Sequence, residues 1–337
     1  MTKQNRLGCL SVFLFLALCV SLFVNFMIVV ARSARVSGLS ARSVPKFEEQ
    51  TVLPGKDSNE SKIALISLRG VISGSEAGSM GETMVDDLKL QLEQASSDEK
   101  VKAVVLFVDS PGGEVTASDI IYNAVKKVRD QAKKPVVVYM GSLAASGGYY
   151  VSCGGSYLIA NDTTFTGSIG VIMQTLHYED LFNKVGLQMI TFKSGKFKDL
   201  LSGSRTLTDD EKTYVQGLVM QTYDKFLGIV STERKLDKEA LRTGLADGRV
   251  ISGKDALEAK LIDATGSVED AYAKAMELGK TKGATVIRYE SAFKLGKLFR
   301  LLGQSDRNSK IEVNVTEALK PKLEAGRLYY LPSMFAP

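Results

Sequence analysis

The sequence predicts an α/β protein with a largely parallel sheet, preceded by one membrane-spanning helix. From residue 62 onward, short apolar runs alternate with segments of helical spacing, which is typical of βαβ units. The runs at 101–108 and 135–139 are almost continuously apolar, as in strands buried on both faces. An uncharged stretch at 7–31 precedes this pattern.

The first half of the pattern alternates regularly. The predicted elements are, in order, a strand at 63–68, a helix at 84–95, a strand at 101–108, a helix at 117–132 and a strand at 135–139. Each strand is short and rich in β-branched residues, and turn residues follow it.

The second half is less regular. Thr208 and Glu211 have the spacing of a capping box, which predicts a long helix to about Arg234. The other predicted elements are a turn entering a helix at 141–150, strands at 157–161 and 188–192, a short helix and turn within 252–263, and a helix at 270–278.

Composition excludes several classes of function. The net charge is only +5, and no basic tract is interleaved with aromatic residues, so nucleic acid is not an expected partner. The three cysteines form no CxxC or Cys/His cluster, and no Walker-type loop is present. We therefore expect no metal and no other cofactor.

The N-terminal segment is long enough for a retained anchor. Residues 7–31 would span a hydrocarbon core of about 30 Å, whereas the apolar core of a cleaved signal peptide has about 7–15 residues. We expect a tail at 1–6, an anchor at 7–31 and a linker at 32–61. Basic residues flank both ends, so charge alone leaves the orientation open, but the short tail favours an extracytoplasmic catalytic domain.

Two glycine-bearing turns follow the two most buried strands, at 109–113 and 141–148. Glycine lets a turn present backbone N–H groups without a side chain in the way, and two such groups aimed at one point form an oxyanion hole. Ser146 enters the helix expected after the second turn, where the helix dipole favours negative charge. Turns of this kind are also often purely structural.

A serine nucleophile needs a base, and His177 is the only histidine. A lone histidine beside acidic residues is more often a surface residue than a catalytic one. Lysine is the alternative, since Ser–Lys pairs are an established variant. Lys193, Lys196 and Lys198 follow the strand predicted at 188–192, but lysines in such a run usually belong to a solvated face.

Four motifs together resemble signal peptide peptidase A. They are Val108-Asp-Ser-Pro-Gly-Gly113, Ala144-Ala-Ser-Gly-Gly-Tyr149, Thr166-Gly-Ser-Ile-Gly-Val171 and Lys193-Ser-Gly-Lys-Phe-Lys-Asp199, in the order of that family. The chain is similar to the short, single-copy form. The resemblance implies a ClpP/crotonase-like fold of repeated ββα and βαβ units at 62–295, followed by a C-terminal extension at 296–337.

The resemblance also implies the site residues. The nucleophile falls on Ser146, the general base on Lys198, and the oxyanion donors on the N–H groups of Gly113 and Gly147. Ser168 would orient the lysine, although it could also simply cap a turn. A lysine base must be neutral, and because the ordinary lysine pKa is about 10.4, the site must be shielded from water.

The family's activity then becomes the expectation: a single-pass protease of the cell membrane that degrades remnant signal peptides after their release from preproteins. Family members form rings or domes in which neighbouring domains contribute serine and lysine, so we expect a homo-oligomer, an octamer, that is inactive as a monomer. Apolar peptides and the membrane are the expected partners.

Other interpretations remain open at this point. They are a protease of the same fold with other membrane or extracytoplasmic targets, a crotonase-like acyl-CoA module, and a non-catalytic ring-forming scaffold. The apolar tail at 328–337 could be packing or disordered chain, or it could enter the protease groove as a pseudo-substrate and be trimmed.

Overall fold

The structure is a computed structural model that describes residues 16–18, 20–25, 47–56, 60–74, 83–291 and 329–330. It divides the chain into two units, Met1–Pro45 and Lys46–Pro337. In the first unit residues 16–18 and 20–25 are helical with exposed apolar side chains. Within the described ranges, no helix has the length and apolar character needed to cross a membrane. The rest of the predicted anchor lies outside those ranges.

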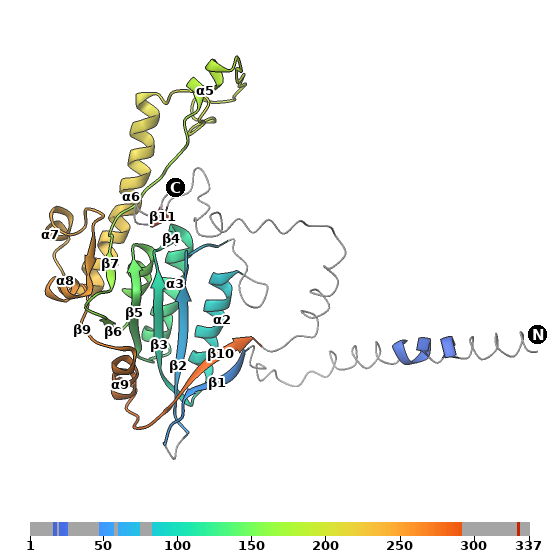
Figure 1. Ribbon diagram of the computed structural model, residues 1–337, viewed down its shortest axis with the longest axis vertical. Coiled ribbons are helices and arrows are strands. Elements are labelled where there is room, and N and C mark those ends of the chain that lie inside the picture. Colours follow the sequence, from blue (N-terminus) through green and yellow to red (C-terminus); the bar gives the residue numbers. More distant parts are fainter. Residues whose placement is uncertain are drawn as a thin grey trace, which may run out of the picture. The chain divides into compact units, whose positions relative to one another are not determined.

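The second unit contains a nine-stranded sheet with the strand order β1-β10-β2-β3-β5-β6-β9, in which β7 also pairs with β5, and β8 with β7 (Figure 1). The pairs along the centre, from β10 to β9, are parallel, whereas β1 is antiparallel to β10 and β7 to β8. The strands are β1 (Phe47–Leu53), β2 (Lys62–Arg69), β3 (Val101–Ser110), β5 (Val136–Ala145), β6 (Tyr157–Ala160), β7 (Phe165–Gly167), β8 (Val250–Ser252), β9 (Ala264–Thr265) and β10 (Thr285–Ser291).

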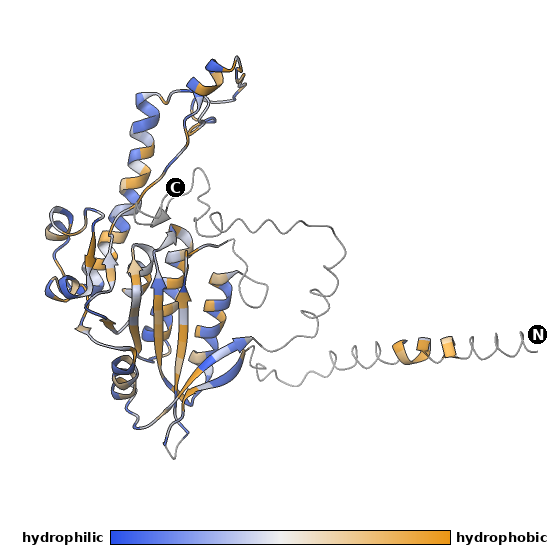
Figure 2. Ribbon diagram, in the orientation of Figure 1, coloured by the Kyte–Doolittle hydropathy of each residue, from blue (hydrophilic) through white to orange (hydrophobic). Residues whose placement is uncertain are grey.

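Helices cover both faces of this sheet, which confirms the α/β prediction. The helices are α2 (Met84–Ser97), α3 (Val115–Asp130), α4 (Gly147–Ser152), α5 (Glu179–Lys184), α6 (Asp209–Arg234), α7 (Lys238–Thr243), α8 (Gly253–Glu258) and α9 (Val268–Leu278). In β2, Ala64 and Ile66 pack into the core shared with α2, α3, α4 and α6, while Ile63 and Leu65 face α9. This alternation explains why the central strands read as continuous apolar runs (Figure 2).

Three predictions about elements were wrong. Residues 47–53, expected in the linker, form β1, whose side chains beyond Phe47 are exposed, so no apolar alternation marks the strand. Residues 188–192 form no strand: they lie exposed, with Phe192 95% accessible, and no strand in the described part of the chain pairs with them. The strand after 135 continues to Ala145, so the sharp turn occurs at Ser146 and not at Gly141.

A second, two-stranded sheet joins β4 (Gly113–Glu114) to β11 (Tyr329–Tyr330) in antiparallel register. The pairing places part of the C-terminal extension beside the first glycine turn (Figure 1).

Residues 172–220 form a segment that we call the arm: α5, its flanking loops and the first half of α6. The second half of α6 is fixed in the core by the buried Phe226, Leu227 and Val230. The arm, in contrast, exposes large apolar side chains. These include Leu176, Leu181, Val185, Ile190 and Phe192 in the loops and α5, and Tyr214 and Met220 on α6.

Candidate active site

Ser146 lies between β5 and α4 in a strained backbone conformation, with φ 54° and ψ −116°. Its N–H donates to the Gly167 carbonyl at 2.8 Å, which holds the turn against β7. The side chain is 1% exposed, and its Oγ is a buried polar atom that finds no hydrogen-bond partner in the described part of the chain. Such strain persists only where the surroundings impose it, and it collects at functional sites.

The two glycine turns meet beside this serine. A Cβ on Gly147 would lie 3.1 Å from the Gly113 nitrogen and 2.6 Å from Ser118 Oγ, so the two backbones are in direct contact. A Cβ on Gly113 would lie 2.0 Å from the Ile72 carbonyl oxygen, which leaves no room for any other residue there. The structure therefore brings together Ser146 and the two backbone segments predicted as oxyanion donors.

The direction of the Gly113 N–H follows from the pairing of its neighbours. Ile72 N–H donates to the Gly112 carbonyl and Glu114 N–H donates to the Ile72 carbonyl, both at 2.8 Å. Because successive groups of an extended chain point to opposite sides, the N–H of Gly113 faces away from Ile72, toward the edge along which Tyr330 of β11 is paired.

Two residues that support this turn were not predicted. The fully buried Ser110 donates its hydroxyl to the Gly70 carbonyl at 2.6 Å and accepts the Gly112 N–H at 3.1 Å. Asp109 accepts the N–H of Leu143 at 3.2 Å, which ties the first turn to β5. Both belong to the Asp-Ser-Pro-Gly-Gly motif, and this motif was the feature of the sequence that could have pointed to them.

Ser168 lies next to the nucleophile because of strand register. Ala145 of β5 is paired with Gly167 of β7, so the residues that follow them, Ser146 and Ser168, leave the sheet side by side. Ser168 is buried, has φ 50°, and donates its N–H to the Arg249 carbonyl at 2.8 Å.

Lys198 lies elsewhere in the chain's own fold. It is exposed, in the loop between α5 and α6. Figure 1 shows this connection at the far end of α6, away from the end of β5. A single chain therefore does not place the predicted base at the predicted nucleophile.

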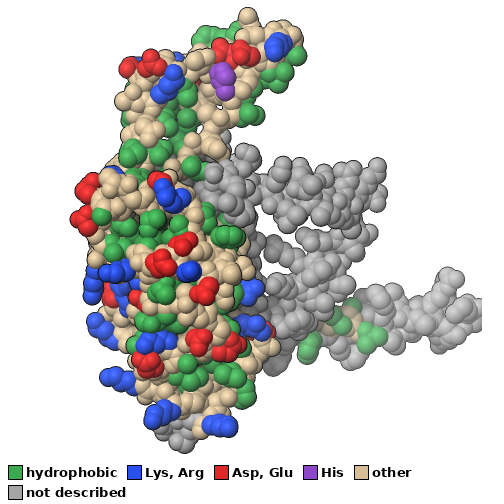
Figure 3. All heavy atoms as spheres, turned by 60° about the vertical axis from the view of Figure 1, so that its left-hand side comes forward, with side chains coloured by type: hydrophobic (Ala, Val, Ile, Leu, Met, Phe, Trp, Pro, Cys, Tyr) green, Lys and Arg blue, Asp and Glu red, His purple; other side chains and the backbone are tan. Residues whose placement is uncertain are grey.

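His177 also belongs to the arm, where its Nε2 lies 3.6 Å from Glu179 Oε2 (Figure 3). Over the described ranges, no group of three or more His, Cys, Asp or Glu side chains is arranged to hold a metal ion. Cys153, the C-cap residue of α4, is buried, and burial raises the pKa of its thiol to about 12, which disfavours the reactive thiolate.

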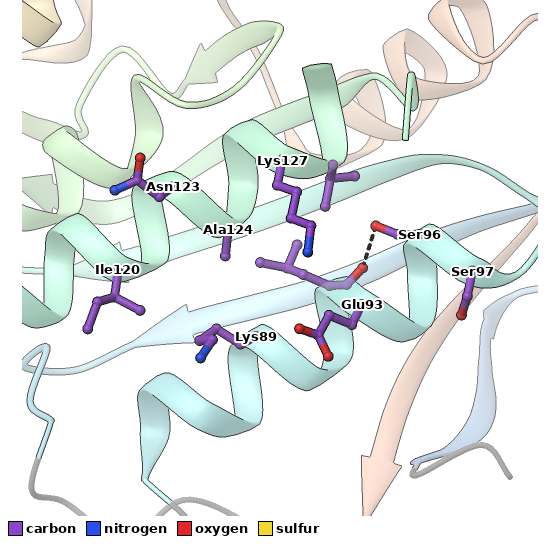
Figure 4. Close-up of a pocket in the computed structure, with 10 residues that line it drawn as sticks. Lys89, Glu93, Ser96, Ser97, Ile120, Asn123, Ala124 and Lys127 are labelled. Atoms are coloured by element: carbon purple, nitrogen blue, oxygen red, sulfur yellow. Dashed lines mark hydrogen bonds between the residues drawn. The ribbon is translucent and has the colours of Figure 1, made fainter. Parts of the chain in front are cut away.

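A surface groove of about 550 Å³ lies between α2 and α3, on the outer side of these helices (Figure 4). Its floor includes Leu92, Ala124 and Val128, and its rim carries Lys89, Glu93 and Lys127. None of the predicted catalytic residues lines it.

Comparison with known families agrees with this geometry. The profile of peptidase family S49 matches residues 128–282, and that of the Clp protease family matches residues 58–161. Together with the α/β sheet and the buried serine at its turn, these matches define the class of the protein as a serine protease related in fold to Clp proteases.

Three relatives narrow the assignment. A protein of Enterococcus faecium, provisionally named signal peptide peptidase SppA, is 36% identical over 73% of this chain and 71% of its own length. A protein of Methanocaldococcus jannaschii, provisionally named a protease, is 40% identical over 59% of this chain and 63% of its own length. Protease 4 of Salmonella typhi is 36% identical over 65% of this chain, which spans only 35% of that longer protein. The chain belongs to peptidase family S49.

Proposed function

We propose that this protein is a membrane-anchored endopeptidase that degrades remnant signal peptides, with Ser146 as nucleophile and Lys198 of a neighbouring copy as general base. One observation carries the proposal. Ser146 Oγ is buried beside two glycine turns with no hydrogen-bond partner among the described residues, while Lys198 of the same chain lies exposed on the arm. A site completed by a second copy accounts for both facts.

The chemistry follows from these positions. Neutral Lys198 accepts the Ser146 proton as Oγ attacks the peptide carbonyl carbon, and the Gly113 and Gly147 N–H groups hold the oxyanion. The lysine then gives its proton to the leaving amine, and an acyl-enzyme remains. The same lysine activates a water that releases the product acid. Ser168, adjacent to Ser146, orients the lysine amine.

Assembly supplies the shielding that a lysine base requires. Exposed apolar side chains such as Ile190 and Phe192 on the arm would be covered by the neighbouring subunit. The same contact would exclude water from the Lys198 amine. A closed ring, which we take to be an octamer, gives every subunit an equivalent site. The predicted anchor at 7–31 holds this ring at the membrane, where apolar signal peptides remain after processing.

Substrates would bind as an extended strand along β4. The antiparallel pairing of Tyr330 with Gly113 supports this, because a strand is already paired with the edge of β4 at the first glycine turn. It also supports the interpretation of the tail at 328–337 as a pseudo-substrate. Mass spectrometry of wild-type protein and of Ser146→Ala tests the tail: identical full-length C termini in both would exclude trimming.

The principal test uses the full-length protein in detergent or vesicles, assayed on a synthetic signal peptide from pH 6 to 10. Cleavage and fluorophosphonate labelling are expected for the wild type, with the rate increasing as the lysine becomes neutral. Ser146→Ala and Lys198→Ala should lower cleavage by at least about 10³-fold, while His177→Ala should leave it unchanged. Full activity of Lys198→Ala would exclude the dyad.

The same assay separates the alternatives. A scaffold or an acyl-CoA module would not be labelled at Ser146. A protease with other targets would be labelled, but would cleave a membrane-protein or extracytoplasmic substrate in preference to the signal peptide.

A further inference from the structure

An ion-pair cluster lies directly beside Lys198, and the mechanism above does not use it. The guanidinium of Arg205 binds both carboxylate oxygens of Asp199, with Nε to Oδ2 at 2.8 Å and Nη2 to Oδ1 at 2.7 Å. It also binds Glu211, with Nη1 to Oε2 at 2.9 Å and Nη2 to Oε1 at 2.6 Å.

We propose that Arg205 is a positioning residue for Lys198. It fixes the loop that carries the lysine to α6, and it neutralises the carboxylate of Asp199, which would otherwise stabilise the charged form of the lysine beside it. The proposal rests on the proposed function, since it assumes that Lys198 is the base.

The positional part follows a continuous series of contacts. The second half of α6 is buried in the core through Phe226, Leu227 and Val230. At the other end Glu211, 1% exposed, closes the capping box by accepting the Thr208 N–H at 2.9 Å. Arg205 links this fixed helix end to Asp199, so the residue next to Lys198 is held relative to the core.

Arginine suits this position better than lysine would. A planar guanidinium can bind two carboxylates with parallel pairs of hydrogen bonds, whereas an ammonium group acts as a single point charge. Arg205 uses its Nε and both terminal nitrogens for Asp199 and Glu211 together.

The electrostatic part concerns Asp199. Hydrogen bonds from Arg205 and then from Lys193, whose Nζ lies 2.8 Å from Oδ1, hold the pKa of this carboxyl well below its usual range. Asp199 is therefore anionic at every pH at which a lysine base can work. An anion adjacent to a lysine favours its protonated, inactive form, unless another cation already compensates that anion.

Most other carboxylates of this region also have cationic partners. Lys196 pairs with Asp210 and Lys212 with Asp209. Glu179, by contrast, accepts the Thr206 hydroxyl at 2.8 Å. The remaining charged groups nearby are Asp180 and Lys184 on α5. If Arg205 is removed, Lys193 is the one cation among these described groups that still pairs with Asp199.

The test compares pH–rate profiles of full-length, assembled Arg205→Ala, Asp199→Asn, the double variant and wild type on the signal peptide. Arg205→Ala is expected to lower the maximal rate about tenfold or more and to move the acid limb of the profile upward by about one pH unit. In the double variant the limb should return to its wild-type position while the maximal rate stays low, because the free carboxylate is gone but the loop remains untethered.

Arg242→Ala is the matched control. Arg242 also bridges two carboxylates, Asp224 at 2.7 Å and Glu239 at 3.2 Å, but it lies on α7. Removal of the Arg242 side chain should leave the acid limb of the pH–rate profile at its wild-type position. Arg205→Lys, which keeps a positive charge, provides a second variant if Arg205→Ala does not assemble. It should lower the maximal rate, but it should shift the acid limb of the pH–rate profile less than Arg205→Ala does.

An acid limb that stays at the wild-type pH in Arg205→Ala and in Arg205→Lys, with the rate reduced equally at all pH values, would overturn the electrostatic role. Unchanged maximal rates in both variants would overturn the positional role. Lys198→Ala distinguishes a failure of the proposed function from a failure of the role proposed for Arg205. If it is inactive while Arg205 variants behave as wild type, the proposed function stands and only this inference fails.

Discussion

Ser146 and Ser168 both adopt positive φ, a conformation that costs a non-glycine residue about 1–3 kcal/mol. They occupy equivalent places just beyond the paired ends of β5 and β7. Backbone hydrogen bonds from Ser146 to Gly167 and from Ser168 to Arg249 hold each turn in place. With these conformations both serines leave the strand ladder at the point where the pairing of β5 with β7 ends.

Gly147→Ala tests the predicted oxyanion hole. The added methyl would meet Ser118 Oγ at 2.6 Å and crowd the Gly113 nitrogen at 3.1 Å, so the two N–H groups could no longer converge. We expect kcat to fall about 10²–10³-fold, the effect of losing one oxyanion donor. Gly228→Ala on the second half of α6 is the control: beyond its chain neighbours and its own helix backbone, no atom of the described residues lies within 4 Å of its Cβ position, and activity should be unchanged. Equal activity of Gly147→Ala and wild type would contradict the assignment.

The arm should loosen in acid through Glu211. Its hydrogen bonds from Arg205 and then from the Thr208 N–H lower the pKa of this carboxyl to about 2, from an ordinary value of 4.5. Because the folded pKa is depressed, its stabilising contribution is complete above pH 4.5 and is lost as the pH falls from there toward 2.

Hydrogen exchange of residues 193–212, corrected for the intrinsic pH dependence, would measure this loosening. Protection should fall between pH 4.5 and 2 in the wild type, and Glu211→Gln should already show the reduced protection at pH 7. Protection that stays constant down to pH 2 would show that this ion pair does not hold the arm.

At the scale of elements, β1 shows why a strand can escape detection from sequence. Phe47 is 2% exposed and packs beside Tyr289, while the other six residues are exposed. Gln94 of α2 receives the Phe47 N–H and donates to its carbonyl, both at 3.0 Å. The strand is held by its backbone pairing, by Phe47 and by polar contacts of Glu49 with Lys62 and of Gln50 with Arg288. None of these leaves a periodic apolar pattern.

Phe47→Ala should therefore destabilise the second unit by about 3 kcal/mol, because it empties a buried site in the core. Val52→Ala on the same strand is the control, since Val52 is exposed and its change should cost less than about 0.5 kcal/mol. Chemical denaturation of both variants measures the difference. Equal midpoints for the two would mean that the Phe47 side chain does not anchor β1 to the core.

At the scale of the whole molecule, the separation of Ser146 from Lys198 predicts complementation between subunits. Ser146→Ala and Lys198→Ala chains are each expected to be inactive. If they are unfolded, mixed in equal amounts and reassembled, about a quarter of the sites in random rings will combine an intact serine with an intact lysine from the neighbour. Mixed rings should recover activity in that proportion.

Two controls make this result decisive. Each variant reassembled alone must stay inactive, and the double variant mixed with Lys198→Ala must also stay inactive, because no intact lysine is present. Failure of the two single variants to complement each other in verified mixed rings would show that serine and lysine work within one chain.

The sequence by itself determined the alternation of strands and helices, since burial on both faces requires apolar runs, and it determined α6, whose capping box is local. The four motifs were also sufficient to select Ser146, Gly113, Gly147, Ser168 and Lys198 as candidates, through resemblance to a family. Short elements such as β4, β7 and β9 were missed because two or three residues carry no periodicity.

Only the tertiary structure decided which of these candidates meet. Gly113 and Gly147 come into contact because two parallel strands end at the same edge of the sheet, and Ser168 joins Ser146 through the register of β5 with β7. The arm carries Lys198 away from that edge, and Arg205 joins the adjacent Asp199 to Glu211 at the start of α6. The contact of the two glycine turns and the register of β5 with β7 join residues far apart in the chain, and no local pattern of residues encodes them.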